Sequence, residues 1–129
     1  MNPTNATIIR KAYDDFARGD IPAVLGAFDA SITWHVPGRS PLSGDYRGHD
    51  EVVGFFKHTM ALCGGIFAIE VHQVLAEEDL VVALVTVKAE RSGRSAAFPE
   101  VHVWRLANKQ VIDFREYQGD ERTEDWFWS

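Results

Sequence analysis

The sequence predicts a small α+β domain in which N-terminal helices pack on a curved antiparallel sheet and enclose an apolar pocket. Two observations lead to this prediction. Apolar residues recur at helical spacing in three segments of the first 63 residues. From residue 66 onward, long segments rich in β-branched and aromatic residues are separated by short turns, which is typical of an antiparallel meander. The 129 residues fit one domain, spanning residues 1–129, that buries its own core.

Three N-terminal segments are expected to be helical. Residues 5–18 alternate apolar and charged side chains at helical spacing. A shorter helix begins at Asp20, with Pro22 in its first turn, where a missing N–H costs nothing. A third helix opens at residues 48–51, whose acidic side chains suit a helix N-terminus, and the glycines at 64–65 end it.

The remaining segments are expected to form strands. An early strand covers residues 32–36, and residues 37–48 after it form a long loop, a feature that often carries function. The segment at 80–87 is apolar on both faces except for Thr86, so its outer side needs a cover. We therefore expect a homodimer formed through the outer face of the sheet. The later strands are expected at residues 66–76, 80–91, 95–107 and 110–117.

Charge and composition disfavour several classes of partner. The net charge is −6, and Lys and Arg are scattered singly, which argues against nucleic acid and against an anionic membrane surface. No apolar run approaches the roughly 20 residues needed to span a bilayer, and residues 1–6 carry no secretory signal pattern. The single cysteine, Cys63, forms no internal disulfide and fits a buried small hydrophobe. A cytoplasmic protein is expected.

No cofactor or metal motif is visible. His49, His58 and His72 are dispersed among apolar positions, and no paired His or Cys spacing typical of a metal site occurs. Phosphate-loop and dinucleotide fingerprints are also missing. We expect no cofactor and no metal, although spacing alone leaves open a metal site assembled in space from His35, His102 and Glu116.

Four short motifs accompany this order of elements. They are residues 17–20 (ARGD), 34–38 (WHVPG), 43–48 (SGDYRG) and 113–117 (DFREY). Over the whole chain, motifs and element order resemble the cone-shaped fold of nuclear transport factor, ketosteroid isomerase and the SnoaL-like polyketide cyclases. The resemblance implies a cone of three N-terminal helices packed on a curved antiparallel sheet. It says less about activity, because the fold hosts isomerases, cyclases, dehydratases, epoxide hydrolases and binding proteins.

The resemblance places three residues at or near positions with catalytic roles. His35 falls where ketosteroid isomerase has its aspartate base, and a histidine with an ordinary pKa of about 6.5 suits that role. His102 falls near the protonated aspartate that donates to the oxyanion, a role open to a neutral imidazole. Tyr13 lies on the helix that carries the family's phenol donor, one residue away from the matching position.

Carboxylates on the last strand are further candidates, because cyclases of this family use an acid/base carboxylate from the sheet. Asp113 and Glu116 lie on opposite faces of that strand, and both remain open. Alternation places Ile112, Phe114, Glu116 and Gln118 on one face, and on the neighbouring strand it groups Glu100, His102 and Trp104. The expected pocket lining is mostly aromatic: Tyr13, Phe16, Trp34, Phe56, Met60, Trp104, Phe114 and Gln118.

Two functions are consistent with these residues. In the first, a small apolar substrate with a carbonyl or epoxide binds in the pocket, His35 moves a proton, and His102 with Tyr13 stabilises the oxygen. The reaction would be an isomerisation, cyclisation or hydration without a cofactor. In the second, the chain is a non-catalytic ligand-binding or dimeric accessory protein.

The aromatic tail at residues 126–128 would plug the pocket, dock on the sheet or pack across a dimer.

Overall fold

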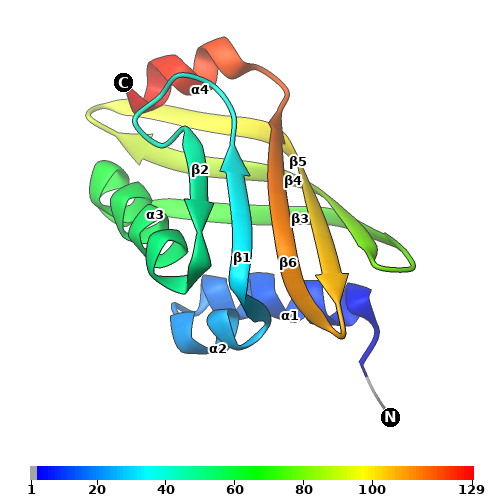
Figure 1. Ribbon diagram of the computed structural model, residues 1–129. Helices are drawn as coiled ribbons and strands as arrows, with labels where there is room; N and C mark the ends of the chain where they lie inside the picture. The colour runs from blue at the N-terminus through cyan, green and yellow to red at the C-terminus, as the bar shows by residue number, and fades with distance from the viewer. Residues whose placement is uncertain (1–2) are drawn as a thin grey trace.

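The computed structural model describes residues 3–129 and shows four helices on a curved, unclosed sheet of six strands (Figure 1). The α+β class is therefore confirmed. None of the helices in the described residues is long and apolar enough to cross a membrane. In chain order the elements are α1 (Asn5–Ala17), α2 (Ile21–Gly26), β1 (Phe28–Val36), β2 (Gly44–Arg47), α3 (Gly48–Cys63), β3 (Phe67–Glu77), β4 (Leu80–Arg91), β5 (Arg94–Ala107), β6 (Gln110–Gln118) and α4 (Glu121–Trp128).

The strand order across the sheet is β2-β1-β6-β5-β4-β3. Adjacent strands are antiparallel except β1 and β6, which run parallel, so the expectation of a purely antiparallel sheet is corrected. The physical reason is the long connection through α3 and the meander, which brings the chain back beside β1 in the same direction. The loop expected at residues 37–48 also contains a short edge strand, β2.

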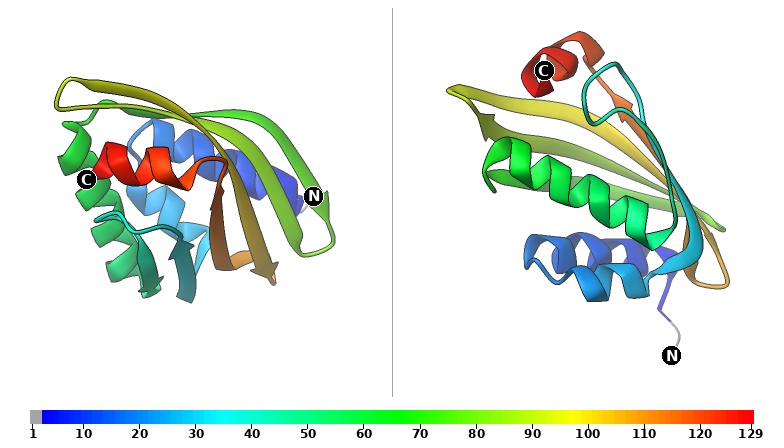
Figure 2. Two further views of the ribbon diagram at one scale, coloured as in Figure 1. Left: turned by 90° about the horizontal axis from the view of Figure 1, so that it is seen from above. Right: turned by 60° about the vertical axis from the view of Figure 1, so that its left-hand side comes forward.

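The helices α1 and α3 lie on the concave side of the sheet (Figure 2). The α1 helix begins where the Thr4 side chain accepts a hydrogen bond from the Thr7 backbone, and it buries Ile9 and Tyr13 on one face. The α3 helix ends at Gly64, whose left-handed φ of 61° is unstrained only because glycine has no Cβ. These two helices form the wall of the core that faces the sheet.

The fourth helix, α4, differs from expectation, because the aromatic cluster in the tail predicts burial but no particular secondary structure. It begins at Asp120, whose side chain accepts a hydrogen bond from the Thr123 backbone at 3.1 Å. An aspartate at the position just before a helix is a capping signal that the sequence does contain. The tail therefore docks as a helix across the wide end of the sheet (Figures 1 and 2).

A β-bulge on β6 corrects the predicted alternation. The pairing register between β5 and β6 shifts at Leu106, so Val111 is fully buried and Ile112 is 39% exposed. Ile112 therefore does not share the inner face of Phe114, as simple alternation predicts. Beyond the bulge the pattern holds, and Phe114, Glu116 and Gln118 face inward.

Candidate active site

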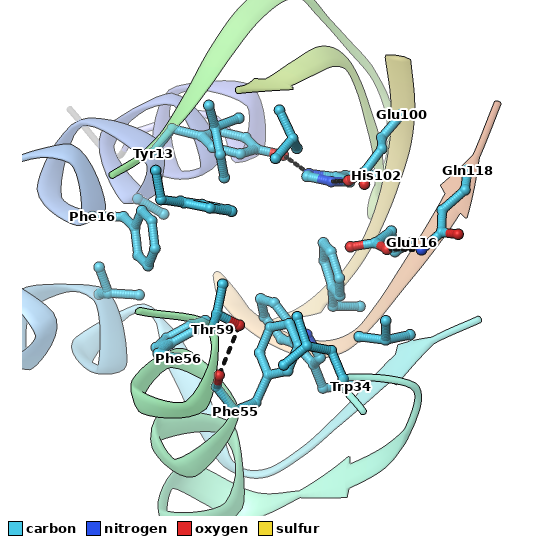
Figure 3. A pocket seen from close by; sticks show the side chains of 18 of the residues that line it. Tyr13, Phe16, Trp34, Phe55, Phe56, Thr59, Glu100, His102, Glu116 and Gln118 are labelled. Carbon is cyan, nitrogen blue, oxygen red and sulfur yellow. Dashed lines mark hydrogen bonds and ion pairs between the residues drawn. The ribbon is translucent and has the colours of Figure 1, made fainter. Parts of the chain in front are cut away.

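An apolar cavity of about 80 Å³ lies between the concave side of the sheet and the helices (Figure 3). Aromatic rings form most of its wall, and Trp34 stacks on Phe114 with ring centres 3.7 Å apart. Of the expected lining residues, Met60 packs against the core instead of lining the cavity. The others do line it: Tyr13, Phe16, Trp34, Phe56, Trp104, Phe114 and Gln118.

Polar side chains gather at one end of the cavity and form a continuous hydrogen-bonded chain. The indole N–H of Trp104 donates to the Tyr13 hydroxyl oxygen at 3.1 Å. That hydroxyl lies 2.7 Å from Nδ1 of His102, and Nε2 of His102 lies 2.8 Å from Oε1 of Glu100 (Figure 3). All four residues are buried, so this hydrogen-bonded chain of side chains is closed to bulk water.

Strand alternation puts these groups in place. On β5, Glu100, His102 and Trp104 occupy every second position and share the inner face. On β6, Glu116 pairs with His102, and its Oε2 accepts a hydrogen bond from Gln118 Nε2 at 2.7 Å. Two neighbouring strands and α1 therefore direct their polar side chains to the same place.

Burial sets the protonation states of the side chains in this hydrogen-bonded chain. Desolvation lowers the pKa of His102 to about 4, against the opposing effect of the nearby Glu116 carboxylate, so the imidazole is neutral at pH 7. Burial and the Glu116 carboxylate raise the pKa of Glu100 well above its usual range. Burial also raises the pKa of the Tyr13 hydroxyl. Tyr13, His102 and Glu100 are thus neutral proton carriers in the resting site.

A third carboxyl group reaches the cavity from α4. Glu124 is only 2% exposed, and its carboxyl group lies next to that of Glu100. Burial, followed by its contact with Glu100, raises the pKa of Glu124 strongly. None of the described residues that line the cavity is a lysine or an arginine. Because no cationic side chain neutralises Glu100 and Glu124, protons must do so.

The same groups meet the spacing of a metal centre. The donor atoms of Glu100, His102 and Glu116 all lie within 4.8 Å of one another. However, both ring nitrogens of His102 already have hydrogen-bond partners, and Glu100 bonds to both His102 and Glu124. The arrangement therefore fits proton sharing better than metal ligation.

His35 and Asp113 do not reach the cavity. Trp34 and Val36 point inward from β1, so strand alternation turns His35 to the opposite face, where it pairs with Asp45 at 2.6 Å and stays 38% exposed. Asp113 lies on the outer face of β6, bonded to Thr33. The structure thus brings His102, Glu116 and Tyr13 together and leaves His35 and Asp113 outside. The metal site considered from His35, His102 and Glu116 is not formed.

Sequence reasoning missed two carboxyl groups of the site. Strand alternation places Glu100 on the same face as His102 but gives Glu100 no role of its own. A carboxylate two residues from an inward histidine is nevertheless a usable signal of a site residue. Glu124 was missed because the tail was not expected to form a helix. Its position becomes visible only once α4 docks over the sheet.

Comparison with known proteins places the chain in a family. The model of the SnoaL-like domain matches residues 9–114. The chain belongs to the SnoaL-like domain family. The matched segment contains Tyr13, Glu100 and His102, whereas Glu116 and Glu124 follow it. The resemblance drawn from the sequence motifs is therefore confirmed.

Relatives of this SnoaL-like chain share its fold over nearly their whole length. Bal32a, from a soil-derived mobile gene cassette, is 32% identical, with a TM-score of 0.93 and coverage of 97% of this chain and 96% of Bal32a. An NTF2-like protein of unknown function from Burkholderia pseudomallei is 27% identical, with a TM-score of 0.89 and coverage of 98% and 99%. An uncharacterized protein of Mycobacterium tuberculosis (strain H37Rv) is 28% identical over 123 residues, which are 95% of this chain and 94% of the relative.

Proposed function

We propose that the cavity binds a small apolar molecule with one carbonyl or epoxide oxygen, and that its polar end transfers a proton on that molecule without a cofactor. The observation that carries this proposal is the hydrogen-bonded chain of ionisable groups at the end of an otherwise aromatic cavity. Membership in the SnoaL-like family supports ligand binding or cyclase-type chemistry.

Glu116 is the proposed base. Its carboxylate lines the cavity, and the Gln118 amide holds it in place at 2.7 Å. It would remove a proton from a carbon next to the ligand's carbonyl group. The electron pair of the broken C–H bond then forms the new C=C bond, and negative charge develops on the carbonyl oxygen.

Tyr13 is the proposed donor to that oxygen. When His102 carries its proton on Nδ1, this N–H and the Trp104 N–H both donate to the Tyr13 oxygen, which leaves the Tyr13 O–H free for the ligand. The protonated Glu100 then donates to Nε2 of the same imidazole. Neutral groups arranged in this way stabilise developing charge without rearrangement during the reaction.

The hydrogen-bonded chain of side chains also returns a proton to each group that gives one up. If Tyr13 gives its proton to the ligand oxygen, it takes one from His102, which in turn takes one from Glu100. Glu100 recovers a proton from Glu116 through the hydrogen bond between the two carboxyl groups. The net result moves one proton from carbon to oxygen, as an isomerisation or cyclisation requires, with no proton drawn from solvent.

Hydrogen–deuterium exchange on model ketones tests this proposal in place of the natural substrate. The protein is incubated in D₂O with small cyclic ketones and enones, and loss of the α-protons is followed by NMR. We expect catalysed exchange that Glu116→Gln lowers about 100-fold or more, since general bases contribute roughly 10²–10⁴-fold. His35→Gln is the matched control, because His35 lies outside the cavity.

Each outcome separates the two candidate functions. Exchange that survives in Glu116→Gln contradicts Glu116 as the base. Saturable binding of the same ketones without any exchange contradicts the enzyme and supports the ligand-binding alternative, which the aromatic lining also favours.

A further inference from the structure

The C-terminal helix α4 closes one side of the cavity. Its residues Glu124 and Trp128 line the cavity, and Phe127 between them is fully buried. Seen from above, α4 crosses the space between α3 and the sheet (Figure 2). Even a ligand of one ring needs a wall to move, because the cavity of about 80 Å³ is smaller than the roughly 150 Å³ engineered cavity that binds benzene.

Packing and backbone contacts fasten the end of α4. The ring of Phe127 packs edge-on against Phe98 at 5.2 Å. Arg94 donates to the Trp126 carbonyl at 2.8 Å, and Arg91 donates to the Ser129 carbonyl. At the other side, Asp125 accepts a hydrogen bond from the Arg39 backbone at 2.9 Å. None of these contacts depends on a buried carboxyl group.

Glu124 is different, because it fastens α4 through a proton. The charged and titratable groups around it are Glu100 and His102 on β5, Glu116 on β6 and Asp125 on α4 itself. No cation among the described cavity residues offsets them. Glu124 and Glu100 are 2% and 5% exposed and line the same cavity, so their carboxyl groups meet out of contact with water. Two carboxyl groups buried together in this way are stable only while one of them keeps a proton.

We propose that α4 is the lid of the cavity and that the carboxyl pair of Glu124 and Glu100 is its latch, which holds while the pair is protonated and releases when a proton is lost. This inference concerns access to the cavity and does not depend on whether the polar end is catalytic. The occupant it admits is the small apolar molecule of the proposed function.

The direction of the pH effect follows from linkage. In the closed lid the raised pKa keeps Glu124 protonated, whereas in the open lid Glu124 meets water and ionises above its ordinary pKa of about 4.3. Opening at neutral pH therefore releases one proton. The equilibrium constant for opening should rise about tenfold for each unit of pH until the closed form itself ionises.

Backbone hydrogen exchange of the whole protein tests the latch. Exchange of the α4 amides is followed between pH 6 and pH 8 and corrected for the intrinsic rate of free amides. In the wild type we expect α4 protection to fall by about a hundredfold over these two units, while amides in β4 and β5 keep theirs. In Glu124→Gln the side chain still donates to Glu100 but has no proton to lose, so its α4 protection should stay constant.

Glu121→Gln is the matched control. Glu121 lies in the exposed first turn of the same helix, so this variant makes the same Glu-to-Gln change without touching Glu100, and it should follow the wild type. Wild-type α4 protection that does not change with pH overturns the latch, even if Glu124→Gln fails to fold. An equal response of Glu121→Gln and Glu124→Gln also overturns it. The uncharged apolar dye N-phenyl-1-naphthylamine should enter the wild-type cavity faster at pH 8 than at pH 6, and equal rates at the two pH values contradict the latch.

Discussion

His102 shows how much a single residue depends on its neighbours. It is 4% exposed and bonds to Tyr13 on one side and to Glu100 on the other. Strand alternation predicts its inward position together with Trp104, because a strand repeats every two residues. The same rule, with the inward Trp34, could have excluded His35, but the resemblance to ketosteroid isomerase outweighed it.

Replacing His102 should cost stability as well as function. His102→Leu removes one hydrogen-bond partner from the buried Tyr13 hydroxyl and one from the buried Glu100 carboxyl, and each such loss costs about 1–3 kcal/mol. We expect a loss of roughly 2–5 kcal/mol in the free energy of unfolding, measured by urea denaturation. His35→Leu, at a half-exposed position, should change it by less than about 1 kcal/mol. Similar losses of unfolding free energy in the two variants would contradict the buried hydrogen-bonded chain around His102.

At the scale of elements, the helices and long strands were predictable, and their ends and irregularities were not. The bulge at Ile112 depends on how β5 and β6 pair, and no local pattern in the sequence announces it. The parallel pairing of β1 with β6 depends on a connection through most of the chain. The Asp120 cap of α4 is present in the sequence, but the aromatic tail obscures it.

The loop before β2 fits α4 tightly at Gly38. This glycine has a left-handed φ of 95°, and a Cβ added to it would lie 2.5 Å from Asp125 Oδ1. Gly38→Ala should therefore strain the backbone and push aside the Asp125 carboxylate that binds the Arg39 backbone. We expect it to destabilise the protein by about 1–3 kcal/mol and to raise hydrogen exchange in α4. Gly26→Ala is the control, because a Cβ there meets nothing within 4 Å and its φ is not left-handed. Unchanged α4 exchange in Gly38→Ala contradicts the tight fit.

At the scale of the molecule, the outer face of the sheet is unusually apolar. Val82 and Leu84 on β4 and Val101 and Val103 on β5 point outward and are only partly buried, and Tyr117 beside them is exposed. We propose that this face pairs with a second copy of the chain, as the two-sided apolar strand at residues 80–87 predicts.

Sedimentation tests this pairing. The wild type should have a dimer mass at micromolar concentration, and Val101→Glu should be a folded monomer because it buries a charge in the apolar face. Lys57→Glu, on the exposed side of α3, should leave the dimer intact. A wild type that sediments as a monomer at this concentration contradicts the pairing.

The central claim is that a buried, neutral imidazole links the proton carriers at the end of an apolar cavity. NMR titration of the His102 ring nitrogens in the folded protein tests it most directly. The structure predicts that His102 stays neutral as the pH falls and takes up a proton only near its lowered pKa of about 4. Protonation near the ordinary histidine value of about 6.5 would contradict the claim, because the imidazole would then be open to water.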